Sequence, residues 1–149
     1  MPVRALHPEE RADAVAMMRA LWPDAGDADL DGVTVLVWER EEPAARRLGG
    51  FVAASLREWA EGCESTPVPY VEGWWVAPEL RGTGVGRALI AAVEAWCVAN
   101  GHTELASDVE VENTGSLQAH AALGFEPTVR LQYFRKRLGR PRADGVSTR

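Results

Sequence analysis

A short segment in the middle of the chain combines glycines and arginines in a pattern typical of anion binding. It reads Arg81-Gly82-Thr83-Gly84-Val85-Gly86-Arg87, and an apolar pattern with helical spacing begins at Val85. Three glycines at alternate positions allow a tight turn and leave backbone N–H groups uncovered at the positive end of a helix dipole. The segment predicts a phosphate or pyrophosphate site, with a plain strand-to-helix turn as the alternative.

Other phosphate-binding motifs and metal sites find no support in the sequence. No Gly-Lys-Ser/Thr follows the glycines, as a P-loop requires, and the spacing G-x-G-x-G differs from the dinucleotide fingerprint G-x-G-x-x-G. The three histidines and the two cysteines are far apart and lack the spacing of metal ligands. We therefore expect no metal.

Two carboxylates are candidates for proton transfer. Glu72 lies inside an apolar strand pattern, where strand alternation puts Tyr70, Glu72 and Trp74 on one face. A buried carboxylate needs a partner or a function, although an edge position in water is the alternative. Asp108 follows a short strand, where ligands of open sheets gather and where aspartate also caps turns. Either carboxylate could act as a general base.

His120 is a candidate proton donor in the last predicted helix. A histidine changes charge near neutral pH and could protonate a leaving group. It could equally be a partly buried helix residue with a backbone partner, and the sequence leaves the two readings open.

The predicted elements alternate in a way that suits a mixed sheet. Strands are expected at 3–6, 33–38, 48–56, 70–76, 103–107 and 129–137, and helices from Pro8 to Pro23, from Val85 to Asn100-Gly101, and from Asn113 to Leu123. The strand–helix–strand order over 70–107 implies a parallel pair with a right-handed crossover. The sequence thus predicts an α+β fold, with a mixed, mostly antiparallel central sheet flanked by helices.

Length and charge limit the remaining possibilities. The 149 residues suit one domain, which we place at 1–138, with a disordered tail at 139–149. A net charge of −6 argues against nucleic acid and favours a cationic partner, although plain solubility explains it equally well. No apolar run is long enough for a membrane span, and we expect a cytoplasmic protein.

The glycine-rich segment resembles the Arg/Gln-x-x-Gly-x-Gly/Ala signature of the Gcn5-related N-acetyltransferases, which holds the pyrophosphate of acetyl-CoA. Asn113 and Leu123-Gly124-Phe125 resemble the ends of that family's later motif, and His120 stands where the motif usually has tyrosine. Shorter pieces resemble the aminoglycoside 6′-N-acetyltransferases: 71–76, Ala106-Ser107-Asp108, 123–126 and 133–137.

The resemblance implies a fold, a set of site residues and a cosubstrate, acetyl-CoA. The fold would be that of the acetyltransferases (GNAT). Asp108, Glu72 and His120 would be catalytic. Substrate would contact Trp22, Glu72, Trp74 and Asp108. The cosubstrate would contact Trp75, Val76, Arg81, Gly82, Thr83, Gly84, Val85, Gly86, Arg87 and Asn113.

The resemblance also implies an activity and an assembly. The expected reaction is acetyl transfer to the 6′-amino group of a cationic aminoglycoside, which would confer antibiotic resistance. The alternatives are an acetyltransferase for another polyamine or protein amine, and a non-catalytic module that binds acyl-CoA or the antibiotic. A homodimer is expected, with the aromatic segment around Tyr133 and Phe134 as a pairing surface.

Overall fold

The computed structural model describes residues 2–41 and 47–141 and has one five-stranded sheet in the order β1-β2-β3-β4-β5. The strands are β1 (Val3–Ala5), β2 (Thr34–Glu39), β3 (Leu48–Arg57), β4 (Val68–Val76) and β5 (Ala106–Ser107). The first four pair antiparallel, and β5 runs parallel to β4. This confirms the mixed, mostly antiparallel sheet and the crossover that the sequence predicts.

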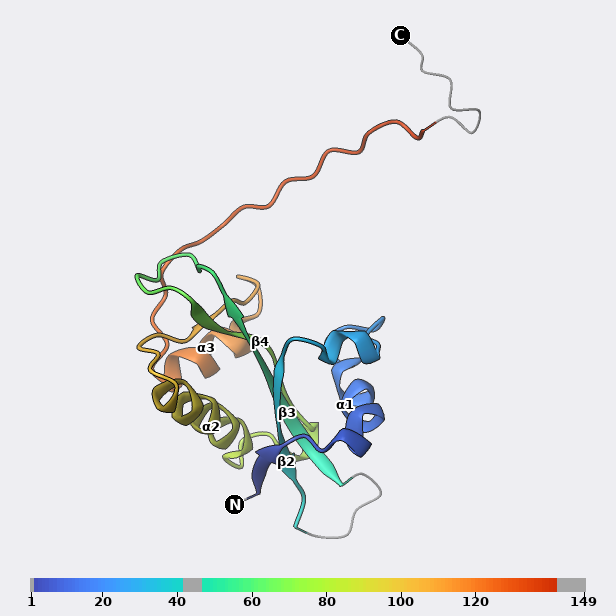
Figure 1. Ribbon diagram of the computed structural model, residues 1–149. Coiled ribbons are helices and arrows are strands. Elements are labelled where there is room, and N and C mark those ends of the chain that lie inside the picture. The colour runs from blue at the N-terminus through green and yellow to red at the C-terminus, as the bar shows by residue number, and fades with distance from the viewer. Residues whose placement is uncertain (1, 42–46, 142–149) are drawn as a thin grey trace.

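Helices cover both faces of this sheet (Figure 1). Helix α1 (Arg11–Met18) lies on one face, and α2 (Val85–Ala99) and α3 (Thr114–Ala122) lie on the other. Short 3-10 turns, η1 (Pro8–Glu10), η2 (Asp27–Leu30) and η3 (Pro78–Leu80), connect the elements. The predicted end of the first helix is wrong. The helix was expected to extend to Pro23, but its last residue is Met18, so the segment from Arg19 to Trp22 lies beyond it.

The strand β3 carries the core because its side chains alternate between the two layers. Phe51 is fully buried among the residues that pack on α1, whereas Val52 is fully buried among those that pack on α2. The side chains of Leu89 and Ile90 of α2 are at most 1% exposed. Both layers therefore depend on the period of two along one central strand.

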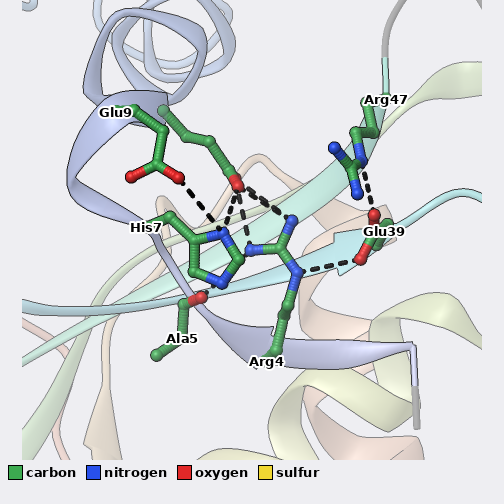
Figure 2. Close-up of polar contacts among 7 residues, drawn as sticks. Arg4, Ala5, His7, Glu9, Glu39 and Arg47 are labelled. Carbon is green, nitrogen blue, oxygen red and sulfur yellow. Dashed lines mark hydrogen bonds and ion pairs between the residues drawn. The ribbon is translucent and has the colours of Figure 1, made fainter.

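Charged side chains fasten the first strand to the sheet (Figure 2). The Nε of Arg4 donates to Glu39 on β2 at 2.9 Å, and Arg47 donates to the other oxygen of Glu39. Hydrogen bonds from Arg4 and Arg47 lower the pKa of Glu39. The other end of the Arg4 guanidinium binds Glu10, which connects β1 to the turn before α1.

A β-bulge in β4 changes which side chains share a face. Ala53 is paired with Gly73 and the next residue, Ala54, is paired with Val71, so Glu72 is the extra residue. A Cβ at Gly73 would clash with the ring of Trp22 on the α1 face, whereas Trp74 packs in the α2 layer. The predicted common face of Tyr70, Glu72 and Trp74 is therefore wrong for Trp74, because a bulge shifts the alternation by one residue.

The predicted strand at 129–137 is also wrong. The chain from Glu126 to residue 141 has no helix or strand and extends away from the sheet (Figure 1). Its apolar side chains have no layer to pack on, and Phe134 is 90% exposed. Most of the predicted disordered tail, 142–149, lies outside the described residues. No helix in the described part of the chain is long and apolar enough to cross a membrane.

Candidate functional site

The glycine-rich loop connects the end of β4 to the start of α2. Gly82 and Gly84 have φ angles of 77° and 97°, which residues with a Cβ rarely adopt. The first helical hydrogen bond is from Ala88 N–H to the Gly84 carbonyl at 3.0 Å, so the amides before Ala88 in this turn are left for a ligand. The Nε of Arg81 donates to the Val76 carbonyl at 2.9 Å and fixes the loop against the strand. The loop therefore has the geometry of an anion site.

Trp74 links this loop to His120. A Cβ at Gly86 would lie 3.1 Å from the Trp74 ring, so only glycine allows this close approach without displacement. The Trp74 ring also meets the imidazole of His120 edge-on, with centroids 5.4 Å apart. Its Nε1 is buried and has no hydrogen-bond partner within the described ranges. A buried donor without a partner at this place fits a bound molecule that runs from the loop toward His120.

Strands β4 and β5 pair over only two residues and then separate. The pairs are Tyr70 with Ala106 and Val71 with Ser107, and beyond them β4 has no strand partner on its β5 side in the described chain. The backbone groups of Glu72–Val76 on this side are an open edge, which an extended molecule with amide groups can pair with. This edge begins beside Ser107 and Asp108 and ends at the glycine-rich loop.

An acidic cavity lies on the opposite, α1 side of the sheet. Its volume is about 590 Å³. Trp22 contributes an aromatic wall, and four carboxylate residues line the cavity: Asp24, Asp29, Asp31 and Glu72. Three of these belong to the segment between α1 and β2, and Glu72 comes from the bulge of β4. Such a cavity suits a ligand with several positive charges.

Glu72 is already well supplied with hydrogen-bond donors. Ser55 Oγ donates to Oε1 at 2.6 Å, and Arg57 donates from Nε to Oε1 at 2.9 Å and from Nη2 to Oε2 at 2.8 Å. Burial would raise the pKa of Glu72, but the hydrogen bonds from Arg57 and Ser55 outweigh it and lower the pKa. Glu72 therefore stays ionised and has a charged partner in the free protein.

Asp108 has a different environment. The Tyr70 hydroxyl donates to its Oδ2, and Oδ1 has no hydrogen-bond partner among residues 2–41 and 47–141. Asp108 is exposed at the end of β5, while Tyr70 is 5% exposed. Arg57 places its guanidinium carbon 3.5 Å from the centre of the Tyr70 ring. One oxygen of Asp108 is thus held and the other is free to accept a proton.

His120 is held at both ring nitrogens. Its Nδ1 lies 2.7 Å from the Ser116 carbonyl, which can only accept, so Nδ1 carries the hydrogen. In the neutral ring Nε2 then accepts from the hydroxyl of Ser107, 2.9 Å away. Phe125 packs against the ring edge, with centroids 5.1 Å apart. Ser107 therefore stands between the imidazole and the place where β4 and β5 separate.

The structure brings the predicted residues to two neighbouring places. Glu72 and Trp22 line the cavity. Asp108 does not line it but contacts Tyr70, and Trp74, which was expected with these residues, lies with His120 on the side of α2. Trp75 packs against the α1 layer. Asn113 caps α3, with its Oδ1 accepting from Ser116 N–H at 3.1 Å, as its sequence position predicts.

Sequence reasoning missed four residues that contact the predicted ones: Ser55, Arg57, Tyr70 and Ser107. One signal was available. Ser55 and Arg57 are polar residues two apart at the end of an apolar strand, so they share a face. That this face meets Glu72 depends on the register between β3 and β4.

Comparison with known proteins identifies the class. Residues 4–125 match the acetyltransferase (GNAT) family, and the chain belongs to this family of enzymes. It is 41% identical to the aminoglycoside N(6′)-acetyltransferase type 1 of Stenotrophomonas maltophilia, over 89% of this chain and 91% of that one. The protein of the same name from Klebsiella aerogenes is 36% identical, over 91% and 96% of the two chains.

Two solved structures have the same fold. AAC(6′)-Ih from Acinetobacter baumannii superposes with a TM-score of 0.79 at 30% identity, over 92% of this chain and 98% of that one. AAC(6′)-Iy in complex with the bisubstrate analogue CoA-S-monomethyl-acetylneamine gives a TM-score of 0.78 at 33% identity, over 91% and 97%.

Proposed function

We propose that this protein transfers the acetyl group of acetyl-CoA to the 6′-amino group of an aminoglycoside and so confers resistance. The observation that carries the proposal is the acidic cavity, which ends at Glu72 where β4 and β5 separate. Aminoglycosides are sugars with several ammonium groups, so four carboxylates and an aromatic wall suit them. The names of the relatives point to the same substrate class and the same amine.

Acetyl-CoA fits the opposite side of the sheet. Its pyrophosphate would bind the free amides of Gly82–Arg87, with Arg81 and Arg87 nearby, and its amide-containing arm would pair with the open edge of β4. The backbone N–H groups near Trp75 and Val76 would polarise the thioester carbonyl. Asn113, which caps the start of α3, would also contact the cosubstrate.

The different environments of the two carboxylates assign them different roles. Glu72 has three hydrogen bonds and a cationic partner, which suits it to attract and orient the antibiotic. Asp108 has a free oxygen, which suits it to accept the proton of the ammonium group. The amine then attacks the thioester carbon, the new C–N bond forms and the C–S bond breaks.

The departing sulfur needs a proton, and the Ser107–His120 pair is placed to supply it. With a protonated imidazole, Nε2 donates to Ser107 and the Ser107 hydroxyl passes its proton to the sulfur. The products are the acetamide and the free thiol of CoA. The nitrogen loses a second proton as the acetamide forms. This proton and the one that Asp108 took pass to solvent, and His120 takes up one proton from solvent, which restores the imidazolium.

The test of the activity is a CoA-release assay over a panel of amines, with the acetylated position determined by NMR. We expect rapid release with aminoglycosides that carry a 6′-amino group and none with analogues that carry a 6′-hydroxyl. Faster turnover of linear polyamines or of peptide amines would mean that these amines, and not aminoglycosides, are the substrate. Tight binding of acetyl-CoA and antibiotic without CoA release would make the protein a binding module.

The C-terminal segment supports a homodimer. Val129, Leu131 and Tyr133 alternate along an extended, exposed chain, which is the pattern of a strand that lacks a sheet. Among residues 2–41 and 47–141, no strand pairs with the outer side of β5. Residues 129–141 carry five basic and no acidic side chains, whereas the loop after β5 carries Asp108, Glu110 and Glu112. A second copy is therefore a complementary partner for the segment.

Light scattering at micromolar concentration tests this assembly. We expect a dimer for the full chain and for a control truncated after Leu138, and a monomer for a chain truncated after Thr128. The substitution Leu131→Glu tests the same surface without removing it. A monomeric full chain would reject the dimer.

We also propose a cytoplasmic location. The two cysteines, Cys63 and Cys97, are not bridged, which fits a reducing compartment. Fractionation of expressing cells with antibodies to the protein would test the location, and recovery outside the cytoplasmic fraction would contradict it.

A further inference from the structure

Tyr70 connects the two carboxylates of the site. Its hydroxyl donates to Asp108 Oδ2, and the guanidinium that lies over its ring belongs to Arg57, the same arginine that holds Glu72 through both carboxylate oxygens. Tyr70 comes from β4, Arg57 from β3 and Asp108 from the end of β5. Three neighbouring strands therefore meet in one continuous set of contacts.

The surroundings of Tyr70 keep it a hydrogen-bond donor. Burial raises the pKa of Tyr70, and the hydrogen bond to Asp108 and its negative charge raise the pKa further. Arg57 acts in the opposite direction, since a cation over the ring draws electron density from the phenol. The phenol thus stays protonated, and the cation strengthens its hydrogen bond to the carboxylate.

Asp108 depends on this bond for its orientation. It is exposed, it follows a strand of only two residues, and Tyr70 is the one hydrogen-bond partner of its carboxylate in the described chain. An exposed aspartate without such a bond samples several rotamers. A base that must stand within hydrogen-bond reach of an ammonium group loses rate when its position varies.

We propose that Tyr70 is a positioning residue for acetyl transfer, which holds Asp108 by one oxygen so that the other faces the acceptor amine. Arg57 packs against the face of the Tyr70 ring. Because Arg57 also binds Glu72, a change in the charge of Glu72 is transmitted to Asp108 through Tyr70. The inference rests on the role proposed above for Asp108. It adds a buried phenol and a guanidinium to the groups on which turnover depends.

The opposing possibility is that Tyr70 only fills space. Its ring packs with Ala60, Val68, Cys63 and Ala106, and a phenyl ring would fill the same volume. A space-filling role predicts that loss of the hydroxyl changes no kinetic constant. A positioning role predicts that kcat alone falls.

The substitution Tyr70→Phe separates these possibilities, and Thr103→Val is the control. Thr103 is exposed, so this control also removes one hydroxyl but away from the site. We expect Tyr70→Phe to lower kcat by about tenfold or more, as displaced catalytic groups do. The KM for acetyl-CoA and the melting temperature should stay close to wild type, and the control should match wild type throughout.

A double-mutant cycle with Asp108→Asn tests whether Tyr70 acts through Asp108. Tyr70→Phe should cost nothing further in kcat once Asp108 is replaced. An equal loss in both backgrounds, or wild-type kcat for Tyr70→Phe alone, would overturn the inference. Arg57→Met leaves the phenol in place and should lower kcat by a smaller factor, again only when Asp108 is present. That variant also serves if Tyr70→Phe does not fold.

The cycle keeps the two proposals apart. If Asp108→Asn has wild-type kcat, then Asp108 is not the base and the proposed mechanism is wrong at its first step. If Asp108→Asn is inactive and Tyr70→Phe is fully active, the mechanism stands and only the positioning role is rejected.

Discussion

The loop at the start of α2 and the carboxylates near β5 are built in different ways. In the loop, backbone conformation makes the site: two glycines have positive φ angles, and a helix begins directly after them. Near β5, side chains from three strands and from α3 make the site, and the contacts join residues 13 to 38 positions apart. A change in the loop should therefore act on binding of one ligand, whereas a change near β5 should act on turnover.

The largest effect is expected at Asp108. Asp108→Asn keeps size and polarity but removes the proton acceptor, so kcat should fall by about 10²–10⁴-fold. The dissociation constant of acetyl-CoA should not change, because the loop is elsewhere. Steady-state kinetics with isothermal titration calorimetry measures both, and Asp13→Asn on the exposed face of α1 is the control.

The variant Glu72→Gln must be compared with Asp108→Asn. We expect a higher KM for the antibiotic with a smaller loss of kcat, since Glu72 is assigned to binding. A Glu72 variant without turnover beside an Asp108 variant with wild-type kcat would reverse the two assignments.

Gly84→Val should act on the other region. The left-handed conformation at Gly84 costs a residue with a Cβ about 1–2 kcal/mol, and a β-branched one resists it most. We expect the dissociation constant of acetyl-CoA to rise by about tenfold or more, with antibiotic binding unchanged. Gly139→Val is the control, because Gly139 has equally open surroundings but no positive φ angle. Unchanged affinity in a folded Gly84 variant would remove the anion-site interpretation.

Ser107→Ala should weaken one specific contact. If the hydroxyl meets the sulfur of CoA, the variant should bind CoA several-fold more weakly and bind desulfo-CoA, which lacks the thiol, as wild type does. Calorimetry with the two ligands measures the difference. Equal losses for both ligands would place Ser107 away from the sulfur.

The ion pair between Arg57 and Glu72 should contribute stability that depends on pH. The folded state lowers the pKa of Glu72 below its ordinary value of 4.5, so the contribution is full above that value. It should disappear as pH falls through the lower, folded-state pKa. Thermal unfolding of wild type and Glu72→Gln should therefore differ more at pH 7 than at pH 3. A constant difference would mean that charge is not involved.

The smallest expected effect is at the start of α3. Asn113→Ala removes the bond to Ser116 N–H and should lower the free energy of unfolding by about 1 kcal/mol. Chemical denaturation measures it, and Asn113→Asp should retain most of the stability. A much larger loss in acetyl-CoA affinity than in stability would support its proposed contact with the cosubstrate.

Local patterns determined much of this protein. The helical period from Val85 to Ala99, the glycines before it and the cap at Asn113 are set by neighbours in the chain, and the sequence predicts each of them. The parallel crossover between β4 and β5 also follows from the order of elements. Such features depend on interactions over a few residues, which spacing alone records.

Tertiary structure decided which side chains meet. The bulge at Glu72 depends on the pairing of β3 with β4, and it moved Trp74 to the side of α2. The contacts of Tyr70 with Asp108 and of Arg57 with Glu72 join distant segments, so no local period records them. The segment 129–137 has the alternation of a strand, yet a strand forms only where another strand supplies its hydrogen bonds.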